Sequence, residues 1–148
     1  MSSPVITLSP VSGSFPFETK MIPLPSGTKI ALGYEMPNGP ARLPSTTNGW
    51  FAPQQTEDTA IDAVFPLPLS FLHAELWCDG GKVFIRDLKA PFGTLVNGTT
   101  ITEDTVLKQG DVVGLGKKVP REDKTPVYLT DLHLCAVTAE VSISGLSS

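Results

Sequence analysis

Apolar and polar side chains alternate over short runs of this chain, and tight turns separate the runs. The clearest example extends from Leu69 to Gly98. Within it, Asp79-Gly80 and Asn97-Gly98 predict hairpin turns of type I′, in which both central residues need a positive φ. The stretch therefore predicts two β-hairpins. The loops at Ser70 and at Ala90 to Gly93 are expected to emerge at the same end of a sheet.

Alternation predicts further strands on both sides of this stretch. Thr28 to Gly33 is expected to be a half-buried strand, and Phe15 to Leu24 an edge strand with prolines near its ends. Val112 to Gly116 reads as a strand, and Val127 to Ile143 as the long closing strand. In that last run the apolar positions change from one face to the other. The sequence leaves open whether a bulge or two-sided burial explains the change.

Two segments lack this alternation. Residues 1–14 are rich in serine and proline and are expected to form a flexible arm, so the folded domain should span residues 15–145. The region from Tyr34 to Pro68 is rich in proline and is expected to be a long insertion. Trp50 and Phe51 should anchor its middle to the sheet by burying aromatic area, and Thr56 to Val64 is compatible with a helical turn.

Composition narrows the class of protein. A chain of 148 residues has the size of one domain, and its 14 prolines and 13 glycines leave little room for long helices. About ten short strands with regularly spaced turns predict an all-β sandwich. The net charge of −4 argues against a nucleic-acid surface. No apolar run has membrane-spanning length, and two cysteines suit a reducing compartment, so an intracellular, soluble protein is expected.

Catalytic and metal chemistry find little support in the residue pattern. The two histidines and two cysteines lack the close paired spacing of zinc ligands. Ser70, His73 and Asp87 contain the side chains of a hydrolase triad, but no motif supplies an oxyanion hole. We therefore expect no enzyme activity, no cofactor and no metal.

Several motifs together resemble the forkhead-associated (FHA) domain. They are Ser70-Phe71-Leu72-His73-Ala74, Ile85-Arg86-Asp87, Gly93-Thr94-Leu95-Val96-Asn97-Gly98 and Gly110-Asp111. The resemblance covers about Phe15 to Ser142. It implies an FHA-type (SMAD/FHA-like) β-sandwich of about ten to eleven mostly antiparallel strands, with the long insertion between Tyr34 and Pro68.

A narrower resemblance points to one branch of that family. Asn48-Gly49-Trp50-Phe51, His73-Ala74-Glu75-Leu76-Trp77 and the long last strand are similar to the fungal relatives of sarcolemma-associated protein (SLMAP). That likeness implies association with a striatin-type phosphatase-kinase scaffold. Membrane tethering in such proteins comes from a tail segment, which a longer full-length protein would carry. The localisation expected for the domain itself is the cytoplasm.

The FHA family binds phosphothreonine peptides with two arginines, two hydroxyl side chains and an asparagine at one end of the sandwich. Carried over position by position, the first arginine falls on Tyr34 and the second on Phe71. The first hydroxyl is kept as Ser70, the second falls on Ala90, and the peptide-gripping asparagine falls on Phe92. The residues that frame the pocket in the family are retained as His73, Gly93, Thr94 and Asn97.

Loss of both arginines removes the charge-assisted hydrogen bonds that hold a phosphate dianion. The resemblance therefore implies a non-catalytic protein–protein interaction module that binds a scaffold without phosphate. Three alternatives remain open for the replaced positions. Phe71 and Phe92 pack against each other or under the insertion, they form an apolar contact surface, or Ser70 and Lys89 rebuild an atypical phosphothreonine site, with Arg86 or Arg42 as further candidate cations.

Overall fold

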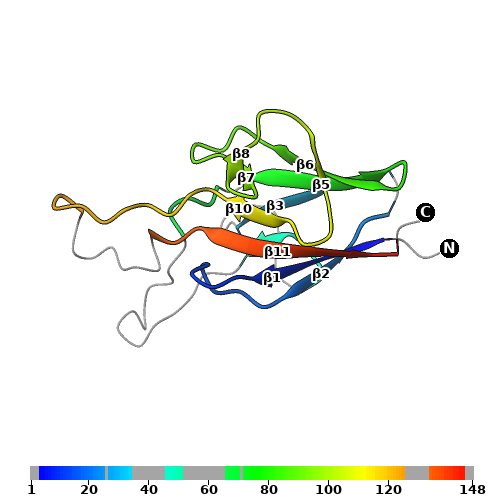
Figure 1. Cartoon of the computed structure of the whole chain (residues 1–148), viewed down its shortest axis with the longest axis horizontal. Helices are drawn as coiled ribbons and strands as arrows, with labels where there is room; N and C mark the ends of the chain where they lie inside the picture. Colours follow the sequence, from blue (N-terminus) through cyan, green and yellow to red (C-terminus); the bar gives the residue numbers. More distant parts are fainter. Residues whose placement is uncertain are drawn as a thin grey trace.

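Two β-sheets pack face to face and form a sandwich (Figure 1). The computed structural model describes residues 4–25, 27–34, 46–51, 66–70, 72–125 and 134–145, and the Tyr34 side chain is outside the description. The strands are β1 (Val5–Pro10), β2 (Lys20–Pro23), β3 (Ile30–Tyr34), β4 (Trp50–Phe51), β5 (Ala74–Asp79), β6 (Lys82–Asp87), β7 (Thr94–Val96), β8 (Thr99–Thr100), β9 (Thr105–Leu107), β10 (Val112–Leu115) and β11 (Val137–Ser144).

One sheet has six strands in the order β2-β1-β11-β10-β7-β8, and the other has five in the order β4-β3-β5-β6-β9. Neighbouring strands are antiparallel except for β3 and β4, which are parallel. Alternate residues of each strand face the space between the sheets, where Ile6, Leu76, Ile85 and Val141 are at most 1% exposed. The predicted all-β sandwich, with mostly antiparallel strands, is confirmed.

The N-terminal segment corrects one prediction. Residues 5–10 were expected to belong to a flexible arm, but they form β1, which lies between β2 and β11 in the six-stranded sheet. Ile6 and Leu8 alternate with the half-buried residues Val5, Thr7 and Ser9 and are themselves buried in the core. This period-2 pattern outweighs the serine and proline content on which the expectation rested. The sandwich therefore begins at Val5 and not at residue 15.

The insertion is tied to the fold where Trp50 and Phe51 occur. These residues form β4 beside β3, and Phe51 is 2% exposed, as the sequence predicted. The Gly33 amide donates to the Gly49 carbonyl at 3.1 Å. A side chain at Gly49 would collide with the Ala31 carbonyl, so glycine permits this close approach. The possible helical turn from Thr56 to Val64 lies outside the described residues.

Both predicted hairpins are present. Asn97 and Gly98 have φ values of 52° and 83° and join β7 to β8 at the expected position. The turn between β5 and β6 is centred on Gly80 and Gly81, one residue later than Asp79-Gly80, because Asp79 still pairs with Lys82. Figure 1 shows β5 running toward the end of the molecule where the termini lie. The segments before β5 and after β6 therefore lie at the other end.

The observed edge strand and closing strand agree in part with the predicted bounds. β2 is an edge strand but covers only Lys20–Pro23. The described part of the closing strand is Val137–Ser144, and residues 127–133 lie outside the description. Ala136 and Val137 are consecutive and both buried, at 5% and 1% exposure. The apolar face therefore changes at this pair, immediately before β11 begins.

Candidate functional site

His73 connects the two loops at the end of the sandwich remote from the termini. Its Nδ1 atom accepts a hydrogen bond from the Ser70 amide at 3.1 Å, and its Nε2 atom lies 2.7 Å from the Gly93 carbonyl oxygen. Because Nδ1 is an acceptor, Nε2 carries the proton and donates to Gly93. One neutral imidazole therefore fixes the distance between the loop before β5 and the loop after β6.

Burial keeps this imidazole uncharged. The His73 side chain is fully buried. Desolvation lowers its pKa below the ordinary value, and the hydrogen bond to Gly93 and the charge of Asp87 only partly offset this effect. A protonated ring would also lose its acceptor for the Ser70 amide. His73 is therefore suited to a bracing role.

Asp87 shapes the loop that follows β6. Its carboxylate accepts from the Thr94 hydroxyl at 2.7 Å and from the Lys89 amide at 3.1 Å. Lys89 adopts a φ of 63°, which is unusual for a residue with a side chain. The Gly93 amide then donates to the Ala90 carbonyl at 2.9 Å and closes a turn around Pro91 and Phe92. The loop is thus held at both ends by buried or half-buried partners.

Gly116 brings a third segment to this end. A Cβ atom placed on Gly116 would lie 2.5 Å from the Cβ of Pro68 and 3.2 Å from the Cβ of Phe92. The end of β10, the segment before Ser70 and the Ala90 to Gly93 loop therefore meet without room for a side chain at Gly116. The sequence indicated Gly116 only as the last residue of the predicted strand that begins at Val112.

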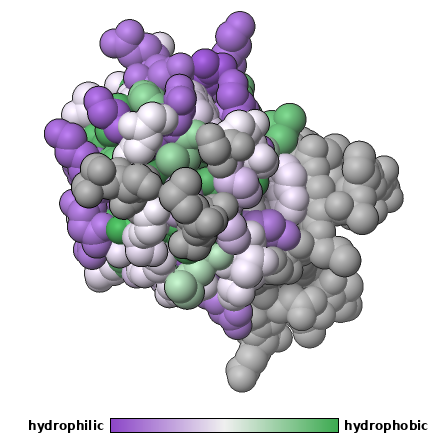
Figure 2. Space-filling model, turned by 90° about the vertical axis from the view of Figure 1, so that its right-hand side faces the viewer, coloured by the Kyte–Doolittle hydropathy of each residue, from purple (hydrophilic) through white to green (hydrophobic). Residues whose placement is uncertain are grey.

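The surface made by these loops carries large apolar side chains. Four large hydrophobic side chains of the described residues are exposed, and three of them are here: Leu67, Leu72 and Phe92, at 44%, 45% and 44%. Lys89 is exposed, whereas Ser70 and Ala90 are half-buried. Figure 2 faces the opposite end, where the coloured surface is mainly hydrophilic or neutral and hydrophobic areas are small and separate.

Most predicted site residues meet at this end. The residues found together here are connected by hydrogen bonds or adjoin one another in sequence: Ser70, His73, Lys89, Ala90, Phe92, Gly93 and Thr94. Asn97 lies elsewhere, beyond the other end of β7, where its amide group bonds the Asp111 carboxylate and the Val112 amide. Asn97 therefore braces a hairpin against the turn before β10 and does not border the loops.

Two of the predicted contact residues lie partly or wholly outside the described part of the chain. The backbone of Tyr34 ends β3 and pairs with Phe51, but nothing is described of its side chain, and Phe71 lies outside the described residues. Sequence reasoning missed Leu67 and Leu72. Their only signal was position, because Leu67 precedes the loop at Ser70 and Leu72 stands in the Ser70-to-Ala74 motif where the resemblance implies no contact.

The part of the chain that the structure describes contains no group of three or more histidine, cysteine, aspartate or glutamate side chains placed to hold a metal ion. In those same ranges, no helix is both long and apolar enough to span a bilayer.

Comparison with known proteins identifies the class. Residues 56–116 match the family model of the FHA domain. The solution structure of the FHA domain of an Arabidopsis thaliana hypothetical protein superposes with a TM-score of 0.58 at 22% identity, covering 100% of this chain and 93% of that one. The match of residues 56–116 identifies an FHA domain, and domains of this family are non-catalytic protein–protein interaction modules that typically bind phosphothreonine peptides.

Two fungal proteins are similar in sequence. Vacuolar protein sorting-associated protein 64 of Saccharomyces cerevisiae is 52% identical over 80 residues, which are 50% of this chain and 13% of that protein. An uncharacterized protein of Schizosaccharomyces pombe is 32% identical over 130 residues, which are 82% of this chain and 38% of that protein. The matched part of the chain thus spans well under half the length of either relative.

Proposed function

We propose that this FHA domain binds a protein partner through an apolar contact at the loop end, without requiring phosphate. The observation that carries the proposal is the exposure of Leu67, Leu72 and Phe92 on the loops that the family uses for binding. Aromatic and aliphatic side chains that protrude from a rigid frame are typical anchors of protein interfaces. The hydrogen bonds of His73 and Asp87 supply that frame.

The residue types at the loop end also disfavour a phosphate dianion. In the family two arginines neutralise it, whereas this chain has Tyr34 and Phe71 at the corresponding positions. Each charge-assisted hydrogen bond contributes roughly 1.5–3 kcal/mol, so the loss of two such partners removes most of the affinity for phosphate. An uncompensated dianion beside apolar side chains would be destabilised further.

A specific observation supports a second candidate, an atypical phosphothreonine reader. Lys89 is exposed in the loop next to Ala90, and Ser70 stands in the opposite loop, so a cation and a hydroxyl are available at the same end. This reader would use Lys89 as its principal cation. Such a reader would bind a peptide only when the peptide is phosphorylated, whereas the apolar contact of the first proposal needs no phosphate.

The partner class is proposed from likeness. Similarity to fungal SLMAP-like proteins suggests a component of a striatin-type phosphatase-kinase scaffold, and the match to the Saccharomyces cerevisiae relative is consistent with that branch. We accordingly expect the domain to act in the cytoplasm.

The test compares phosphothreonine and unphosphorylated versions of peptides from such a scaffold by isothermal titration. The proposal expects each pair to bind with affinities within about twofold, because no arginine engages the phosphate. A Leu72→Ser/Phe92→Ser variant should bind at least tenfold more weakly. Met21→Ser is the matched control, since Met21 is 57% exposed but lies on the edge strand β2.

The opposite result is equally informative. Micromolar binding of only the phosphorylated peptides, abolished by Lys89→Gln, would overturn the apolar proposal and favour the atypical reader. Unchanged binding by the Leu72→Ser/Phe92→Ser variant, with its fold intact by circular dichroism, would remove the loop end as the contact surface.

A further inference from the structure

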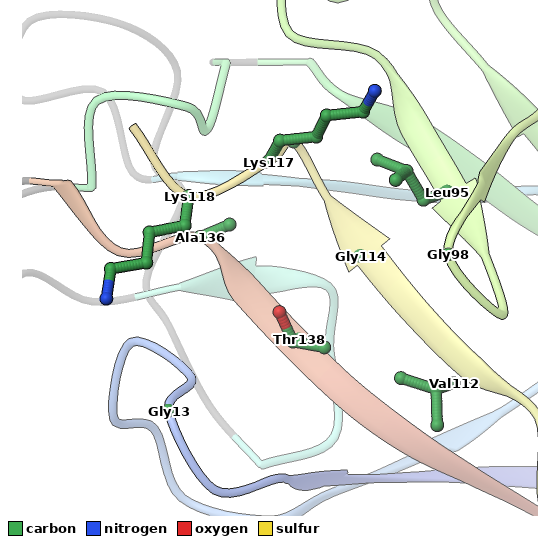
Figure 3. A pocket seen from close by; sticks show the side chains of 10 residues that line it. Gly13, Leu95, Gly98, Val112, Gly114, Lys117, Lys118, Ala136 and Thr138 are labelled. Carbon is green, nitrogen blue, oxygen red and sulfur yellow. The ribbon is translucent and has the colours of Figure 1, made fainter. Parts of the chain in front are cut away.

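The outer face of the six-stranded sheet is hollowed where β7, β10 and β11 lie side by side. Leu95 pairs with Gly114, and Gly114 pairs with Thr138, so a glycine stands between two larger residues in one cross-strand row. The resulting hollow has a volume of about 320 Å³. Figure 3 shows Lys117 and Lys118 at one end of it and Val112 toward the other. This volume is at the low end of the range for ligand sites and suits an inserted side chain.

The floor of the hollow is apolar but separate from the core. Val113 and Leu115 of β10 point into the core cluster, so Val112 and Gly114 face outward. Leu95 lies in the same outward row, does not belong to the core cluster, and is still only 8% exposed. A buried leucine on the solvent side of a sheet indicates a concave apolar surface. A Cβ atom on Gly114 would lie 3.6 Å from the Leu95 Cβ and would begin to fill it.

The rim of the hollow is positively charged. Lys117 and Lys118 line it and are exposed, and the lining that the structure describes includes no aspartate or glutamate. None of the salt bridges within the described ranges involves either lysine. Acidic residues lie at the end away from the lysines, where Glu140 pairs with Val112 and Asp111 precedes Val112 in the chain. This local charge is opposite to the net charge of −4 of the chain.

A second depression of about 420 Å³ shares Lys118 with the first and includes Val119, Pro120, Arg121 and Leu134. The two depressions therefore form one path, which starts over β10 and follows the chain that leaves this strand. The exposed residues Glu122 and Asp123 follow Arg121 in the chain, so the positive charge is centred on Lys117 and Lys118. An extended polypeptide could lie along such a path with its apolar and charged side chains on alternate sides.

We infer that this path, from Val112 past Lys118 to Arg121, is a second docking surface for an acidic segment of a protein partner. One apolar side chain of the segment inserts over Gly114 between Leu95 and Thr138. Carboxylates on the side of that residue toward Lys118 meet Lys117 and Lys118 at the rim. Charge complementarity selects the acidic segment, and the hollow selects an apolar residue within it. The inference does not depend on how the loop end binds.

A labelled peptide tests the inference on the full chain. The probe has the sequence Glu-Glu-Leu-Glu-Glu, flanked by glycine and serine, and its counterparts replace every Glu by Gln or the Leu by Ala. Methyl-resolved NMR should show shifts at Leu95, Val112 and Thr138 on titration with the Glu-Leu probe. Affinity should fall at least fivefold for the Gln counterpart, at least threefold for the Ala counterpart, and on raising the salt from 50 to 300 mM.

Two charge variants separate a site from a general attraction. Lys117→Gln/Lys118→Gln should weaken binding of the Glu-Leu probe at least fivefold. Lys82→Gln/Lys124→Gln makes the same change in net charge at exposed positions outside the hollow and should leave the affinity within twofold. Equal losses in both variants, equal binding of the Gln counterpart, or methyl shifts confined to Leu67 and Leu72 would overturn the inference. The Leu72→Ser/Phe92→Ser variant should keep full affinity for this probe, so failure of the loop-end proposal would be recognised separately.

Discussion

At the scale of single residues, three buried polar or charged side chains connect segments of this domain by hydrogen bonds. His73, Thr94 and Lys20 are the buried polar or charged side chains of the described residues, and each has a hydrogen-bond partner. The Lys20 ammonium donates to the Trp50 carbonyl at 2.7 Å, and burial lowers its pKa to about 8. It thus ties β2 of one sheet to β4 of the other. At the loop end, the hydrogen bonds of His73 and Thr94 likewise connect the segments that would contact a partner.

His73→Ala should lower the free energy of unfolding by at least about 2 kcal/mol, because the Ser70 amide and the Gly93 carbonyl lose their partner. The wild-type protein should also lose stability as the pH falls below 6.5, the ordinary pKa of the group. In that range the unfolded chain binds a proton that folded His73 binds less readily, so the unfolded state gains.

Urea unfolding at pH 7.5 and at pH 5.5 measures both effects. The decrease between the two pH values should be smaller in His73→Ala than in the wild type, and this difference isolates the histidine from other titrating groups. An equal decrease in both proteins would show that His73 does not carry the pH dependence.

At the scale of elements, the amino-acid composition gives little indication that the segments of β1 and β4 form strands. β1 completes the six-stranded sheet from the N-terminal side by pairing with both β2 and β11. β4 is only two residues long and joins the edge of the five-stranded sheet in parallel with β3. β4 is too short to show a repeating pattern, and the alternation in β1 lies in a segment rich in serine and proline.

Ile6→Ala tests the first strand directly. Ile6 is fully buried between β2 and β11, and its truncation should cost about 2–4 kcal/mol of unfolding free energy through lost burial and a cavity. Thr7→Ala, at the neighbouring half-buried position, is the control and should cost less than about 1 kcal/mol. Denaturant unfolding measures both variants. A flexible arm would instead give no change for Ile6→Ala.

At the scale of the whole molecule, the residues that hold the loops in place differ from the residues that would contact a partner. The strands and the hydrogen bonds of His73 and Asp87 form the frame, and the exposed side chains Leu67, Leu72 and Phe92 at the loop end are apolar. A second surface, the hollow over Gly114, lies on the outer face of the six-stranded sheet and close to the loop end, because Gly116 borders both. A partner that follows the molecule from the loops to this hollow would contact both.

Restoring the family residues should convert the domain into a phosphothreonine reader. The variant Tyr34→Arg/Phe71→Arg/Ala90→Ser/Phe92→Asn is expected to bind a phosphothreonine peptide at least tenfold more tightly than its unphosphorylated form, because two guanidinium groups then meet the dianion. Titration with matched peptides measures the ratio. A folded variant with no preference for phosphate would mean that the bracing residues do not present these positions as the family does.

The sequence by itself determined the all-β class, the hairpin at Asn97-Gly98, the burial of Phe51 and the family of the domain. These features follow from short-range causes, namely period-2 alternation, turn residues with positive φ, and motif spacing. Only the tertiary structure decided that residues 5–10 are a central strand, that Asn97 stands apart from the loop end, and that Leu67 and Leu72 are exposed beside Phe92. The hollow over Gly114 also needed the structure, because it exists only where three strands from distant parts of the chain pair in register. Contacts between residues far apart in sequence depend on how the sheets close, and no local pattern encodes that closure.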